Sequence, residues 1–223
     1  MNKILNRTVW LIALAPVAYL AFVWNNLPET ISLHFDSRGN ADRYGNRKEL
    51  LVIVLFLFTL SVLVYYLFTN IYRIDPKKYA VENKGRLQRI GYAVSVFLAA
   101  ITTMIIYSGI QGNSRLDISL IAGGIGLLFA IIGNYMPNMK PNYFAGFRLP
   151  WTLENADNWK KTHALAGKLW FAGGLLLAVV CLLTPAKVSF IIFISVIAII
   201  TAIPIIYSYR LHKKQKMLNA STY

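Results

Sequence analysis

The chain has 223 residues, of which 57% are hydrophobic, and its formal net charge is +14. A water-soluble domain is typically about 45–50% apolar, and the apolar residues here are gathered into long runs, so the composition excludes an ordinary soluble protein. The positive charge would suggest nucleic acid in a soluble chain, but these cations cluster at the ends of apolar runs, as membrane anchors do. We therefore expect a lipid bilayer around the chain and no nucleic-acid partner.

Six apolar segments are long enough to cross a bilayer, which takes about 20 mostly apolar residues. Their expected bounds are 8–25, 50–71, 90–111, 118–135, 165–183 and 188–209. Each is expected to be a helix, because lipid offers no partner for open backbone groups. The first run is long and lacks a small-x-small cleavage pattern at its end, so we interpret it as a retained span and not a signal peptide.

Most of the Lys and Arg outside these spans lie on one side of the membrane. That side holds both termini and the connections after the second and fourth spans, so the positive-inside rule places all of them in the cytoplasm. We divide the chain into a first module with two spans (1–72), a basic cytoplasmic loop (73–89), a four-helix module (90–212) and a cytoplasmic tail (213–223).

Small residues recur at helical spacing in the fourth span. Ala122, Gly126 and Ala130 lie four residues apart, and such spacing lets two helix backbones approach closely. The stripe is either a dimer face or a contact inside the bundle, and we favour the contact inside the bundle.

The connection between the first two spans, residues 27–48, is the first region where function could lie, and we call it the outer loop. Residues 30–35 suggest a short extended piece, and Gly39, Asn40 and Gly45 suggest tight turns, so a compact loop is expected. His34, Asp36 and Asp42 have side chains that can bind a divalent metal. Since no helical His pair or Cys pair accompanies them, we favour a structural His–Asp hydrogen bond over a metal or a catalytic role.

The second polar region runs from residue 133 to residue 170, and we call it the inner stretch. Its first half cannot be one continuous helix, because Pro137, Pro141 and Pro150 each lack an N–H and restrict the residue before them. We expect a re-entrant or interfacial cytoplasmic loop here. Asn155 can cap the helix that follows, with Asp157 in its first turn.

On that following helix, four residues share one face by i, i+3 and i, i+4 spacing: Trp159, His163, Ala166 and Trp170. The fifth span is therefore expected to begin early, with this face toward the bundle. The stretch is either a polar pocket or a belt of aromatic and basic residues at the membrane boundary. The pocket would contain Asn142, Tyr143, Arg148, Trp159 and His163.

Two sets of residues, one in each polar region, resemble the sequence motifs of known protein families. In the inner stretch they are Gly133, Asn134, Pro137, Lys140, Asn142, Gly146, Arg148, Pro150, Trp151, Thr152, Trp159, His163, Gly167 and Lys168. In the outer loop they are Leu27, Pro28, His34, Phe35, Gly39, Asp42, Tyr44, Gly45 and Lys48. The first set resembles the signature of the SdpI family, immunity proteins against SDP-type peptide toxins. The second resembles a domain of unknown function, DUF1648, that is often found with it.

The resemblance implies an all-α, six-transmembrane-helix protein of the bacterial inner membrane. It would protect its cell from a secreted peptide toxin and, as in one relative, also act as a toxin receptor that holds a cytosolic repressor. The expected outer binding residues are His34, Phe35, Asp36, Asp42 and Tyr44. The expected inner binding residues are Asn134, Asn142, Tyr143, Gly146, Arg148, Pro150, Trp151, Trp159, His163 and Lys168. No cofactor, metal or catalytic set is expected.

Two alternatives from other classes stay open. One is a membrane-embedded, metal-assisted enzyme that uses the His and Asp side chains of the outer loop, and the other is a signal-transducing receptor that recruits a cytosolic regulator. A transporter is disfavoured, because the spans hold almost no ionisable residue of the kind that marks ion pathways.

Overall fold

The structure is a computed structural model that describes residues 3–36, 39–77, 79–112 and 116–220. Its long helices are α1 (Lys3–Val23), α2 (Arg47–Asn70), α3 (Ala80–Ile110), α4 (Ile118–Tyr135), α6 (Ala156–Leu183) and α7 (Ala186–Ala220). All six are long and apolar enough to cross a membrane. The predicted bundle of six membrane-spanning helices is confirmed.

Several helices extend beyond the apolar runs that predicted them. Helix α3 begins at Ala80, ten residues before the expected start of its span at residue 90, and α7 continues to Ala220. An apolar run marks only the part of a helix that lies in lipid, whereas the helix continues through Lys, Arg, Gln and Leu, which are good helix formers in water as well. Most of the basic segment 73–89 and the described part of the tail are therefore helical.

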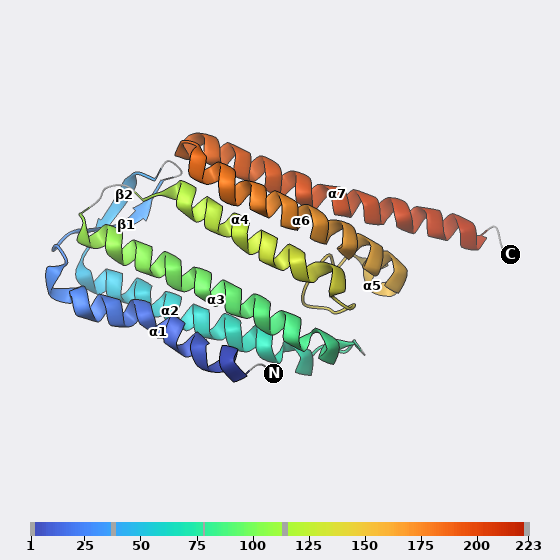
Figure 1. The fold of residues 1–223 in the computed structure, drawn as a ribbon, viewed down its shortest axis with the longest axis horizontal. Coiled ribbons are helices and arrows are strands. Elements are labelled where there is room, and N and C mark those ends of the chain that lie inside the picture. The colour runs from blue at the N-terminus through green and yellow to red at the C-terminus, as the bar shows by residue number, and fades with distance from the viewer. Residues whose placement is uncertain (1–2, 37–38, 78, 113–115, 221–223) are drawn as a thin grey trace.

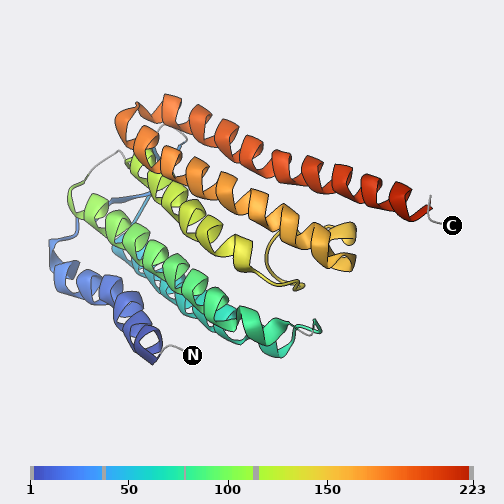
Figure 2. The ribbon, with the colours of Figure 1, turned by 45° about the vertical axis from the view of Figure 1, so that its right-hand side comes forward.

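The six helices form two groups of three. Figures 1 and 2 show α1, α2 and α3 on one side and α4, α6 and α7 on the other, with both termini toward the end opposite the strands. A two-stranded sheet closes one end of the bundle, and the short helix α5 (Pro150–Glu154) lies at the other end. The outer loop and the inner stretch thus occupy opposite ends of the molecule.

The small residues of α4 pack inside the second group. A Cβ atom added at Gly126 would lie 2.7 Å from the Cβ of Leu177 and 2.8 Å from the carbonyl oxygen of Gly174, both on α6. Close approach of two backbones is what such residues permit. The stripe is therefore a contact inside the bundle, as we favoured.

The outer loop contains a β-hairpin. Strand β1 (Ile31–Phe35) pairs with β2 (Ala41–Gly45) in antiparallel fashion, and the second strand was not predicted. Ile31 anchors the hairpin, because it is buried in a cluster with Leu27, Leu50 and Ile106. At the turn, the carbonyl of Gly39 accepts the N–H of Leu116 at 2.8 Å, which attaches the hairpin to the segment that leads into α4.

The connection from α4 to α6 is irregular, as the prolines predict. A 3₁₀ turn, η3 (Met136–Asn138), follows α4, and the chain then runs without regular structure to α5. The Asn155 side chain accepts the N–H of Asn158 at 2.9 Å and caps α6, which confirms the predicted cap and the early start of this helix.

Candidate functional site

The structure offers three kinds of candidate region: the hairpin of the outer loop, the inner stretch, and grooves on the helix surfaces. The hairpin brings together two of the three candidate metal ligands. Nδ1 of His34 lies 2.6 Å from Oδ1 of Asp42 on the opposite strand, and both side chains are largely exposed. Asp36 is used differently, because its Oδ1 accepts the N–H of Asn40 at 2.8 Å. Over the described parts of the chain, no three His, Cys, Asp or Glu side chains gather closely enough to hold a metal ion.

The hairpin presents a mixed polar and aromatic surface. Tyr44 is 53% exposed, Phe35 is half-buried, and Arg43 forms a 2.7 Å ion pair with Glu49 in the first turn of α2. The His34–Asp42 and Arg43–Glu49 pairs are exposed to solvent, where such pairs contribute little to stability. These side chains are therefore available to contact a partner at little cost to the fold.

In the inner stretch, His163 is fully buried and holds the irregular loop against α6. Its Nε2 accepts the backbone N–H of Phe147 at 3.0 Å, and its Nδ1 lies 2.9 Å from the carbonyl oxygen of Trp159. An N–H group can only donate, so Nε2 is unprotonated and Nδ1 carries the proton. The imidazole also stacks on the Trp159 ring, with 3.9 Å between the ring centroids.

Gly146 makes this contact possible. Its φ of +99° is a conformation that favours glycine, and a Cβ atom at this position would collide with Nε2 of His163. The bond from Phe147 to His163 therefore depends on the absence of a side chain one residue earlier.

Two further predicted residues, Trp159 and Asn142, also serve the loop itself. The indole N–H of Trp159 donates to the carbonyl of Met139 at 2.8 Å. Oδ1 of Asn142 accepts the N–H groups of Phe144 and Ala145 at 3.0 and 2.7 Å. Asn142, Trp159 and His163 are all buried, and their hydrogen bonds hold the loop in place.

The remaining predicted residues of the inner stretch lie at its surface. Nη1 of Arg148 donates to the carbonyl of Tyr143 at 2.9 Å, and both residues are exposed. Trp151 donates from its indole N–H to Oγ of Ser208 on α7 at 3.0 Å. The other three, Asn134, Pro150 and Lys168, are exposed. The predicted pocket thus divides into a buried scaffold and an exposed surface.

Several buried polar residues that join the inner stretch to the helices were missed. Asn83 on α3 donates from Nδ2 to the carbonyl of Lys140 and accepts the N–H of the same residue, both at 2.9 Å. Asn158 donates to the carbonyl of Ser208 at 3.0 Å. Polar residues within helices that face the bundle were the available signal, but the sequence did not show which loop they would meet.

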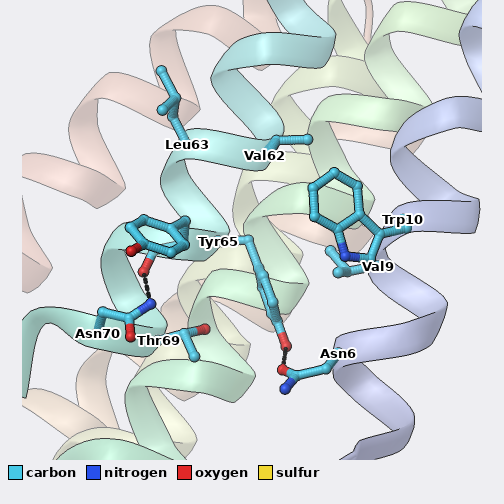
Figure 3. A pocket seen from close by; sticks show the side chains of 9 residues that line it. Asn6, Val9, Trp10, Val62, Leu63, Tyr65, Thr69 and Asn70 are labelled. Atoms are coloured by element: carbon cyan, nitrogen blue, oxygen red, sulfur yellow. Dashed lines mark hydrogen bonds between the residues drawn. The ribbon is translucent and has the colours of Figure 1, made fainter.

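Two of the hollows on the helix surfaces contain polar residues next to an apolar wall. One, of about 480 Å³, lies beneath residues 144–149 and includes Arg148 and Trp170 in its wall. The other, of about 370 Å³, lies between α1 and α2, and we call it the α1–α2 groove. Figure 3 shows Asn6 and Trp10 from α1 facing Tyr65 and Thr69 from α2 across it.

The outer loop and most of the inner stretch fall within segments that match known families. Residues 138–208 match the SdpI/YfhL protein family, and residues 11–65 match the domain of unknown function DUF1648. The chain is 27% identical over 199 residues to the immunity protein SdpI of Bacillus subtilis (strain 168), an alignment that covers 86% of this chain and 88% of that protein. No solved structure matches the chain.

Proposed function

Because residues 138–208 match the SdpI/YfhL protein family and residues 11–65 match DUF1648, we propose that this chain is a membrane immunity protein that protects its own cell from an SDP-type peptide toxin. The observation that carries the proposal is the similarity, over most of both chains, to a protein named as an immunity protein. The multi-pass fold supports it, because a protein that counters a membrane-active peptide must act in the membrane that the peptide attacks.

In this proposal the hairpin of the outer loop is the first surface that the peptide meets. The charge distribution favours both termini in the cytoplasm, and the hairpin lies at the end of the bundle opposite the termini (Figure 1). A secreted peptide arrives from outside, where Tyr44 and the His34–Asp42 pair would be exposed to it. Tyrosine is frequent among residues that dominate binding energy at interfaces.

The same hairpin is placed to affect the rest of the protein. It packs on the first helix group through Ile31 and bonds to Leu116, which precedes α4 of the second group. At the other end, Asn83 of the first group holds Lys140 of the inner stretch. A peptide that displaced the hairpin would loosen one of the links between the groups, which supports the receptor role that we include in the proposal.

The test is survival of a toxin-sensitive strain that expresses this chain and is treated with an SDP-type peptide. We expect the strain to survive a dose that kills cells with the empty vector, and Tyr44→Ala to reduce this protection. Tyr107→Ala is the matched control, because Tyr107 on α3 is 55% exposed and Tyr44 is 53% exposed. Membrane levels of each variant are measured by immunoblotting. Equal killing with and without the wild-type chain, at normal membrane levels, would refute the proposal.

A second candidate role is recruitment of a cytosolic regulator, and the length of α7 favours it. Figures 1 and 2 show that the last turns of α7 project beyond the other helices. Four exposed cations lie there: Arg210, Lys213, Lys214 and Lys216. A basic projection of this kind would attract an acidic partner. This role is tested by affinity capture with the wild-type chain and with a variant in which all four cations are changed to Gln, each with and without toxin peptide. If the wild-type chain and the variant captured the same proteins, this role would be excluded.

A further inference from the structure

The α1–α2 groove changes from polar to apolar along its length. Asn6 in the second turn of α1 and Thr69 and Asn70 at the end of α2 form its polar part. Val62 and Leu63 lie seven residues earlier on α2, about 10 Å deeper at 1.5 Å per residue. Since helix ends lie near the membrane boundary and helix centres in hydrocarbon, this gradient matches that of a lipid molecule.

The groove contains a buried hydroxyl group without a partner. Thr69 is only 4% exposed, and its Oγ1 has no hydrogen-bond partner among the described residues. Buried polar groups are nearly always hydrogen-bonded, so an unpaired one calls for an explanation. Its neighbours are paired: the Tyr65 hydroxyl donates to Oδ1 of Asn6 at 2.5 Å, and Nδ2 of Asn70 donates to the Tyr66 carbonyl at 2.9 Å. Thr69 therefore carries an unpaired donor in the wall of the groove.

Basic residues lie close in sequence to the polar end of the groove, although none is in its wall. Arg7 adjoins Asn6, Lys3 lies one turn earlier, and Arg73 follows Asn70 by three residues. Helix α1 contains no acidic residue, and the one acidic residue of α2, Glu49, begins that helix at the hairpin end. A ligand with a negative charge next to its polar end would be favoured here.

The side of the groove that is open faces lipid. Trp10, Leu63 and Tyr66 in its wall are all more than half exposed on helices that span the membrane. The volume of about 370 Å³ lies within the range of small-molecule sites. The groove therefore has room for part of one lipid molecule, with the rest of that molecule in the surrounding bilayer.

We propose that the α1–α2 groove binds one anionic phospholipid. The acyl chain lies along Val62, Leu63 and Trp10, the Thr69 hydroxyl donates to an ester carbonyl of the lipid, and the phosphate lies near Arg7. This assignment supplies a partner for the buried hydroxyl, fills the apolar part with hydrocarbon and places the negative charge at the end near the basic residues. It goes beyond the immunity function and does not depend on it.

Filling the groove tests whether it is the site. The purified full chain in detergent is titrated with phosphatidylglycerol, and bound lipid is counted by native mass spectrometry. Leu63→Trp should occupy the groove and weaken the tightest lipid at least 10-fold. Leu55→Trp is the control, because Leu55 is an exposed residue of the same helix outside the groove. Equal lipid binding by the two variants would overturn the proposal. A protein dimer that Leu63→Trp abolishes and Leu55→Trp leaves intact would also overturn it, because the groove would then bind a second copy of the chain.

The chemistry of the ligand is tested by changing one group at a time. The wild-type chain should bind ester-linked phosphatidylglycerol about 3- to 10-fold tighter than its ether-linked analogue, which lacks the carbonyl, as expected for one hydrogen bond. Thr69→Val should lose this preference. Thr59→Val should keep it, because the Thr59 hydroxyl already donates to the Leu55 carbonyl at 2.8 Å. Binding of phosphatidylcholine as tight as phosphatidylglycerol would refute the anionic preference, and an ester preference that survives in Thr69→Val would refute the role of Thr69.

Discussion

The backbone N–H of Phe147 donates to Nε2 of His163 across 3.0 Å, and this bond ties the irregular inner stretch to α6. A buried His in a polar stretch suggests chemistry at first sight. Here both of its nitrogens are engaged by backbone groups, and its ring is stacked on Trp159. The geometry indicates that His163 positions the loop and is not free to transfer a proton.

Replacing His163 by Leu should therefore destabilise the protein. The substitution leaves the buried N–H of Phe147 without a partner, whereas the carbonyl of Trp159 keeps its bond within helix α6, so the expected cost is about 1–3 kcal/mol. Denaturant unfolding in detergent measures the change. His212→Leu is the control, since His212 lies on α7, is half-buried and stacks on Trp151; it should cost less than about 1 kcal/mol. A His163→Leu protein of unchanged stability that fails to protect cells would point to a functional histidine instead.

Gly146 should tolerate no side chain. Gly146→Ala combines a strained φ of +99° with a collision against His163, and we expect a loss of at least about 2 kcal/mol in unfolding free energy. Gly85→Ala is the opposite case. Gly85 lies in α3 with no atom within 4 Å of an added Cβ, so Ala there should gain about 0.5–1 kcal/mol from helix propensity. Equal effects of the two substitutions would contradict the packing described around His163.

Asn83 should be as important to the inner stretch as any residue within it. Asn83→Leu removes both hydrogen bonds to Lys140. It leaves the Lys140 N–H unpaired, whereas the Lys140 carbonyl still accepts from Nδ2 of Asn142 at 3.0 Å, so we expect a cost of about 1–3 kcal/mol. We expect faster proteolysis of the 139–149 segment as well, because this clamp joins it to α3. Asn134→Leu on the exposed face of α4 should change stability by no more than about 0.5 kcal/mol. If Asn134→Leu left stability unchanged but abolished protection against the toxin peptide, that result would support the predicted binding role of Asn134.

The six spans could be predicted from sequence because the bilayer imposes a length and a composition on every helix that crosses it. The face formed by Trp159 and His163 also followed from helical spacing, and both residues are buried as that face requires. The second strand of the hairpin was missed because Ala41–Gly45 has a polar, glycine-ended sequence that forms a strand only through its pairing with β1.

The contacts that define the sites could not be predicted, because they join distant parts of the chain. Asn83 and Lys140 are 57 residues apart, and the helical spacing of residues 80–89 does not reveal which loop they meet. The α1–α2 groove likewise depends on how α1 and α2 pack together. The unpaired hydroxyl of Thr69 becomes visible only once that packing is known.

The orientation in the membrane is the prediction on which the proposed toxin surface depends. Tyr44→Cys on the hairpin and Met217→Cys on α7 place a thiol at each end of the molecule, at positions that are 53% and 66% exposed. The native Cys181 is buried, so the wild-type chain serves as the unlabelled control. An impermeant thiol reagent should label Tyr44→Cys in intact cells and Met217→Cys only after the membrane is opened. Labelling of Met217→Cys alone in intact cells would place the hairpin in the cytoplasm, where a secreted peptide could not meet it.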